Sequence, residues 1–193
     1  MTKLKTGNEL FTYNGQALKA SLLDFWRWHG SNLLSNIYRG ALAEFVVAQA
    51  LRIDFTMPRD GWMAYDLVTN DGIKVEVKSS AYLQEWAQKR PSTIQFSIAP
   101  ARAALPDGTY DDSSVRQADV YVFCILCEES MEKVNPLSLD QWMFYVASTK
   151  LLDEIFGTQK SIRLSSLKKV ATGPIAFSGL RNAVEIHYAY QTA

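Results

Sequence analysis

The sequence contains few of the residues that thiol, imidazole and redox enzymes depend on. It has two cysteines and two histidines among 193 residues. Cys124 and Cys127 form a C-x-x-C pair inside an apolar, strand-like segment, whereas redox pairs usually open a helix, and no second pair completes a zinc site. We therefore expect both cysteines to be core residues. His29 and His187 have no neighbours at metal-ligand spacing, and no Ser/His/Asp or Cys/His constellation is evident.

The sequence also lacks any apolar run near the roughly 18 residues that a membrane helix needs. The opening stretch MTKLKTGNEL has no signal-peptide-like apolar segment, so we expect a cytoplasmic protein with reduced thiols and no membrane association. The formal net charge is zero, which disfavours a protein that coats nucleic acid but permits a local basic groove. No P-loop, nucleophile elbow, Rossmann fingerprint or HExxH motif is present.

The length and the 48% hydrophobic content suit one domain with a substantial core. Within that single domain we expect an N-terminal helical extension over 1–30, a core over 32–157 and a C-terminal extension of uncertain structure over 158–193. The hydrophobic pattern predicts helices over 16–28, 32–52 and 148–159, and strands over 63–70, 73–80, 92–100, 119–128 and 141–148. Residues 101–118 are predicted to be mostly loop. This order indicates an α/β (α+β) fold with a mixed central sheet flanked by helices.

The segment IKVEVKSSA, residues 73–81, alternates apolar and charged side chains with a period of two. It therefore predicts a strand that carries Glu76 and Lys78 on one face. The preceding turn, Asn70-Asp71-Gly72, predicts a hairpin that brings Asp66 near Glu76. Two carboxylates on neighbouring strands, which lie roughly 4.8 Å apart, repel one another unless they share a cation or a proton.

Glu44 falls in the predicted long helix at helical spacing from the apolar Ile37, Ala41, Ala48 and Leu51. We therefore expect it to point inward, where a carboxylate needs a partner or a cation. Mg²⁺ suits such a place, because it takes hard oxygen ligands and keeps several waters; Mn²⁺ is an alternative. Lys78 would then lie where it could approach a metal-bound water or a phosphate.

The segment AYD, followed ten residues later by EVK and preceded by a helix with an inward glutamate, resembles the PD-(D/E)xK nuclease superfamily with its restriction-endonuclease-like fold. The resemblance covers roughly residues 32–128 and implies Mg²⁺-dependent hydrolysis of DNA phosphodiesters, as in an endonuclease. The catalytic residues that it implies are Glu44, Asp66, Glu76 and Lys78. It also implies metal ligation by Asp66, Glu76, Glu44 and the backbone carbonyl of Val77. Tyr65 replaces the family's proline, and a loop stands where a helix is expected between the third and fourth strands.

The implied partner is DNA, either duplex or branched. Candidate nucleic-acid contacts are Arg39, Ser80 and Gln84. The rings of Trp62, Tyr82, Trp86 and Tyr110 could stack on bases, although aromatic residues near a sheet are more often core. Locally basic segments contain Lys89, Arg90, Arg102, Arg116, Lys160, Arg163, Lys168 and Lys169.

The sequence is also compatible with other assemblies and functions. One site per chain would cut both strands of a duplex most simply as a homodimer. The same fold could serve as a non-catalytic nucleic-acid-binding or assembly module. In an unrelated α/β protein, Glu76 and Lys78 would be an ordinary solvated pair, and the four candidate residues would never meet.

Overall fold

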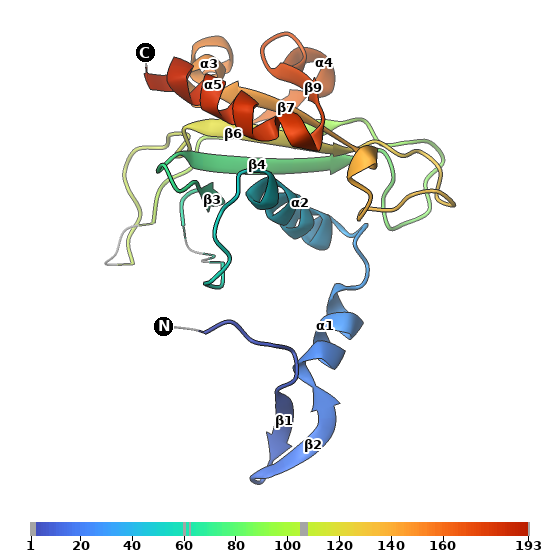
Figure 1. The fold of residues 1–193 in the computed structure, drawn as a ribbon. Coiled ribbons are helices and arrows are strands. Elements are labelled where there is room, and N and C mark those ends of the chain that lie inside the picture. The colour runs from blue at the N-terminus through green and yellow to red at the C-terminus, as the bar shows by residue number, and fades with distance from the viewer. Residues whose placement is uncertain (1–2, 60, 62, 105–107, 193) are drawn as a thin grey trace.

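The computed structural model describes residues 3–192, except 60, 62 and 105–107. A five-stranded sheet in the order β3-β4-β6-β7-β9 forms its centre (Figure 1). Its strands are β3 (Leu67–Val68), β4 (Lys74–Ala81), β6 (Val120–Leu126), β7 (Trp142–Ser148) and β9 (Thr172–Ile175). Strands β4 and β6 pair in parallel and the other pairs are antiparallel. The predicted mixed α+β architecture, with a central sheet flanked by helices, is confirmed.

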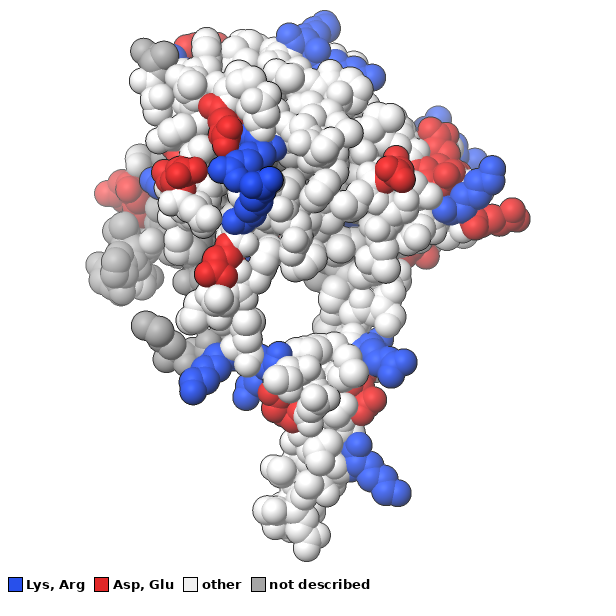
Figure 2. Space-filling view, viewed as in Figure 1, with Lys and Arg blue, Asp and Glu red and all other residues white. Residues whose placement is uncertain are grey.

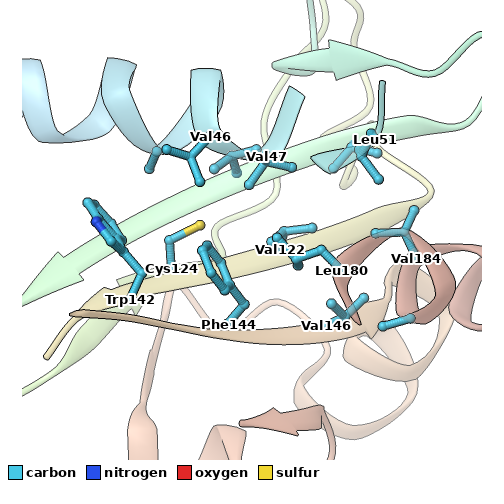
Figure 3. Packing of buried hydrophobic residues seen from close by; sticks show 14 of the residues in the cluster. Val46, Val47, Leu51, Val122, Cys124, Trp142, Phe144, Val146, Leu180 and Val184 are labelled. Carbon is cyan, nitrogen blue, oxygen red and sulfur yellow. The ribbon is translucent and has the colours of Figure 1, made fainter. Parts of the chain in front are cut away.

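Strand β6 lies in the middle of the sheet, and all of its residues are buried. Val122 and Cys124 point towards helices α2 (Asn36–Ala50) and α5 (Leu180–Thr192) and belong to the same apolar cluster as Val46 and Leu180 (Figure 3). Phe123 and Ile125 point to the opposite face and pack in a second apolar cluster. Successive residues of a strand point to opposite faces, so both faces of β6 must be covered for all of its residues to be buried. Strand β6 therefore contributes to both apolar clusters of the core.

The second face is covered by short elements. Strands β5 (Gln95–Ser97) and β8 (Ser161–Arg163) pair with each other in a separate two-stranded sheet. Helices α3 (Thr149–Phe156) and α4 (Leu164–Leu167) contribute Leu152 and Leu167 to the same apolar cluster. Two 3₁₀ turns, η1 (Leu139–Gln141) and η2 (Phe177–Gly179), precede β7 and α5.

The N-terminal part of the chain is a separate arm, which hangs below the body in Figure 1. It contains β1 (Leu10–Tyr13), β2 (Gln16–Ser21) and α1 (Leu22–Gly30). The prediction of a helix over 16–28 within an N-terminal helical extension is wrong for 16–21, which form β2, and is borne out from Leu22 onwards. Asn14 and Gly15 both have positive φ angles, as a two-residue hairpin turn requires, so this segment folds back as a strand.

Three other predicted elements differ from the structure. The strand predicted over 92–100 is short and lies outside the central sheet, because β5 pairs with β8. The strand predicted over 63–70 is reduced to β3. The described part of the C-terminal extension, residues 158–192, contributes to the core, since β9 pairs with β7 and α5 packs against the sheet. The described part of 101–118 is loop, as predicted, with isolated bridges from Ala101 to Val115 and from Ala104 to Tyr110.

No helix among the described residues combines the length and the apolar character needed to cross a bilayer.

Adjacent residues of β7 provide a test of the core. Phe144 is fully buried on the face of β7 that α2 and α5 cover, whereas Met143 is 45% exposed. We expect Phe144→Ala to lower the free energy of unfolding by about 3–5 kcal/mol through lost burial and a residual cavity. Met143→Ala should change it by less than about 1 kcal/mol. Urea unfolding measures both values, and equal effects would contradict this description of the core.

Candidate active site

The candidate site lies at the edge of the sheet where β3 meets β4. On β4, Val75 and Val77 face α2, so the intervening Glu76 and Lys78 face the other side of the sheet. Glu76 stands beside Tyr121 of β6 in the strand register. The Lys78 ammonium forms an ion pair with Glu76 Oε1, and both side chains are largely buried. The Glu76–Lys78 pair that an ordinary solvated strand would also form is therefore present, but both of its side chains are mostly shielded from solvent.

Asp66 is held in position by the backbone of β4. The amide of Val77 donates to Asp66 Oδ2 at 2.8 Å, and the amide of Asp66 donates to the carbonyl of Val75 at 3.2 Å. The predicted turn sets up this pairing, because the amide of Gly72 donates to the carbonyl of Thr69 at 2.9 Å and Gly72 has a φ of +84°. The hairpin expected between Asp66 and Glu76 is thus present. Val77, expected as a carbonyl ligand, contacts Asp66 through its amide.

Glu44 approaches the same edge from α2, and only part of the apolar stripe that the sequence predicted is buried. Ile37 is 80% exposed and Ala41 is also exposed. Ala48 and Leu51 are buried as predicted, together with Ala43 and Val47, which leaves Glu44 at the border of the buried face with its side chain 18% exposed. From this border the Glu44 side chain extends past the edge of the sheet towards Asp66.

Arg59 joins the carboxylates and was not identified from the sequence. Its guanidinium forms an ion pair with Glu44 through Nε and another with Asp66 Oδ1, at 3.2 Å from Nη2. In the sequence, Arg59 stands in a segment whose pattern indicates only a turn, and its two partners lie on different elements. Two arginines, Arg52 and Arg59, lie between Glu44 and Asp66 in the sequence, and only the folded geometry shows which of them joins the carboxylates.

Burial and mutual repulsion act on the two glutamates of the site. Burial is the main cause that raises the pKa of Glu44, with a further rise from Asp66 that Arg59 partly offsets. Burial also raises the pKa of Glu76, which Lys78 partly lowers and Asp66 raises again. The charges of the three carboxylates therefore influence one another, as expected for groups that converge on one place.

These residues fit a divalent cation, although the carboxylates are not arranged as a preformed cage. Glu44 Oε2 is buried and accepts no hydrogen bond of good geometry from the described residues, so its contact with Arg59 is best regarded as an ion pair. Among the described residues, no group of three or more His, Cys, Asp or Glu side chains is placed to hold a metal. Mg²⁺ commonly binds through one or two carboxylates and completes its shell with water and phosphate oxygens. The oxygen donors of Asp66 and Glu76 match that requirement.

Comparison with known proteins assigns the chain to a family. The sequence model described as bacteriophage T4 endonuclease IV matches residues 26–165.

The chain belongs to the bacteriophage T4 endonuclease IV family.

No match was found among curated proteins. Among solved structures, a bacterial homing endonuclease, I-Ssp6803I, is 22% identical over 67% of this chain and 78% of its own, with a TM-score of 0.36. That similarity is too low to inform the site. The match to the endonuclease IV family includes Glu44, Arg59, Asp66, Glu76 and Lys78 and begins within α1.

Other residues predicted to contact nucleic acid are engaged within the fold of this endonuclease IV family member. Arg39 is buried and donates to the carbonyl of Leu34 at 3.1 Å and to Gln84 Oε1 at 3.3 Å. Gln84 and Ser80 are buried as well. Arg39 and Gln84 therefore connect α2 with the segment after β4, and all three side chains have little exposed surface for a ligand.

Of the aromatic and basic candidates, some are exposed and others are buried within the fold. Trp86 and Tyr110 are exposed, Tyr82 is partly buried, and Trp62 lies outside the described residues. Arg116 is fully buried at its side chain, where it donates to the carbonyl of Ile98 and pairs with Asp153. It therefore serves the fold and does not belong to a phosphate-binding groove.

The cysteines and His187 occupy structural positions. Cys124 is buried in the core, as predicted, and burial raises the pKa of its thiol. Cys127 is only partly buried, and like Tyr82 it packs against the second apolar cluster. His187 is buried on α5, with its Nε2 2.9 Å from Thr172 Oγ1.

The raised pKa of Glu44 predicts a gain of stability when its charge is removed. A carboxyl whose pKa is higher in the folded state stabilises the fold below its ordinary value of 4.5, and this contribution is lost as the pH rises through the raised pKa. Without metal at neutral pH, Glu44→Gln should therefore raise the melting temperature by roughly 2–4 °C, equivalent to about 1 kcal/mol. The gain should shrink towards pH 4.

Thermal melts in EDTA across this pH range measure the effect. Glu132→Gln, at an exposed glutamate in the loop before β7, is the control and should change little. A Glu44→Gln protein that melts at or below the wild-type temperature at neutral pH would contradict the electrostatic description.

Proposed function

We propose that this protein is a Mg²⁺-dependent DNA endonuclease whose active site is of the PD-(D/E)xK type. The observation that carries the proposal is the convergence of Glu44, Asp66, Glu76 and Lys78 on one sheet edge, inside the part of the chain that matches an endonuclease family. Three carboxylates with a lysine beside them form a suitable donor set for metal-assisted phosphodiester hydrolysis.

Each side chain has a distinct role in this proposal. Asp66 and Glu76 would hold the metal, and the hydrogen bond from the Val77 amide would keep Asp66 correctly oriented. Lys78 would exchange its contact with Glu76 for the attacking water, and would offset the negative charge that develops on the phosphate oxygens. Glu44 would complete the site directly or through a water.

A bound Mg²⁺ would supply Lewis-acid polarisation of the scissile phosphate and a bound water of lowered pKa. Mn²⁺ has similar ligand preferences and would be an alternative. Before the metal binds, Arg59 would provide part of the positive charge that Glu44 and Asp66 require. Loading of the site therefore requires the guanidinium to move away from at least one of these carboxylates.

A second candidate function has one observation in its favour. Arg59 and Lys78 already offset part of the charge of the carboxylates, which form no preformed metal group among the described residues. Such a site would suit a non-catalytic nucleic-acid-binding module on the same fold. Cleavage assays separate the two proposals, because the module would bind DNA without cutting it.

Glu76→Gln tests the catalytic proposal. The substitution keeps the shape of the side chain but removes the charge that would hold the metal, so cleavage of labelled DNA in Mg²⁺ should fall by at least about 100-fold. Wild-type cleavage should stop in EDTA. Duplex, branched and single-stranded substrates should be compared, because the site residues alone favour none of these forms.

The matched control for this assay is Glu132→Gln, which should retain wild-type cleavage. Circular dichroism should show that both variants are folded. Full activity in Glu76→Gln, or cleavage by the wild type without a divalent metal, would overturn the assigned site.

Arg59→Ala tests whether this guanidinium occupies the place of a cation. Removing it leaves Glu44 and Asp66 without their shared positive partner, so the protein should melt lower in EDTA. Added Mg²⁺ should then raise the melting temperature by at least about 2 °C more than in the wild type, because the metal replaces the lost charge. The exposed Arg90→Ala is the control. Equal Mg²⁺ responses in Arg59→Ala and the wild type would contradict this role.

A further inference from the structure

The arm, defined here as residues 3–30, has an unusual distribution of charge. Its basic residues are Lys3, Lys5, Lys19 and Arg27, and all four side chains are exposed. None of them is in ion-pair contact with a carboxylate in the described structure. In a chain whose formal net charge is zero, the arm is therefore a local concentration of positive charge.

The two carboxylates of the arm are engaged within it. Glu9 accepts hydrogen bonds from the amides of Thr6, at 3.0 Å, and Gly7, at 2.9 Å. Asp24 accepts from the amide of Ser21 at 2.8 Å and completes the capping box of α1. These carboxylates fix the backbone of the arm and leave its basic side chains without ion-pair partners in the described structure.

The arm also exposes aromatic rings. Trp28 is 81% exposed, and its ring lies 6.0 Å from that of His29 and 6.4 Å from that of Phe25, measured between centroids. Helix α1 has no buried residue, so these rings do not belong to the core. Aromatic side chains beside unpaired basic residues form the kind of surface on which nucleic-acid bases stack while the phosphates are held by charge.

The arm is placed close to the candidate site. Leu4, which lies between Lys3 and Lys5, lines the same groove as Glu44 and Arg59. Figure 2 shows an opening between the arm and the body, with Lys and Arg side chains on the arm below it. A polynucleotide with a phosphate at the site would run past the first residues of the arm.

We propose that the arm is a DNA-binding element that holds the polynucleotide against the body, with Lys3, Lys5, Lys19 and Arg27 on phosphates and Trp28 on a base. This inference rests on the proposed nuclease function for the position of the DNA, but binding by the arm does not require cleavage. Pairing between the arms of two copies is disfavoured, because both would bring the same positive charge to the interface.

The test measures DNA binding by fluorescence anisotropy in EDTA, where cleavage does not interfere. Single-stranded and duplex oligonucleotides are titrated over a range of salt concentrations. The charge variant combines Lys3→Gln, Lys5→Gln, Lys19→Gln and Arg27→Gln. Its affinity at low salt should fall by at least about tenfold, and its salt slope should decrease by about 3 if all four contacts are lost. Trp28→Ala should weaken single-strand binding by about fivefold or more.

A matched control is available on the face of the sheet that lies away from the arm (Figure 1). It combines Lys160→Gln, Arg163→Gln, Lys168→Gln and Lys169→Gln, which removes the same number and kind of charges from exposed positions at and around β8 and α4. This control should lower the affinity and the salt slope less than the arm variant does. Circular dichroism confirms that each variant is folded.

The outcomes separate this inference from the proposed function. If the arm variant binds like the wild type, or no worse than the control variant, the inference is wrong even when Glu76→Gln abolishes cleavage. If the arm variant loses binding but the wild type never cleaves DNA, the arm assignment holds and the nuclease proposal fails. A wild type that binds no DNA overturns both. Loss of a dimer in sedimentation by Trp28→Ala, with DNA binding unchanged, would overturn the inference and assign the arm to a second copy.

Discussion

Mutual repulsion among Glu44, Asp66 and Glu76 is the constraint on which the candidate site depends. Three carboxylates at one partly buried edge cannot all stay charged without nearby positive charge, and Arg59 and Lys78 supply it in the described structure. Burial nevertheless raises the pKa values of both glutamates. A site that is this poorly neutralised by its own chain favours a cation, which is the physical basis for expecting a divalent metal there.

The constraint arises because the two edges of β4 have different neighbours. One side of β4 pairs in parallel with the fully buried β6, whereas the other meets only the two residues of β3. Charged side chains near this short edge strand are less costly than they would be at the centre of the sheet, because water and a substrate can still approach. Helix α2 then brings Glu44 to the border of its buried face.

The sequence pattern was sufficient for features that depend on local periodicity and turn chemistry. It predicted β4, its hairpin with the segment after Asp66, the central β6 and the capped helix α3. The hairpin of the arm was missed although Asn14-Gly15 carries a strong turn signal, because the apolar residues that follow also fit a helical spacing. The roles of Arg59 and Arg116 could not be predicted from the sequence, since their partners lie on other elements and burial decides their function.

The most direct test of the central claim is a crystal structure of the protein soaked with Mn²⁺, with anomalous scattering used to locate the ion. We predict an anomalous peak within ligand distance of Asp66 and Glu76, with the Arg59 guanidinium moved away from at least one of its carboxylates. Well-occupied Mn²⁺ elsewhere, with Arg59 still bridging Glu44 and Asp66, would contradict the metal assignment and leave this edge of the sheet as a structural ion-pair cluster.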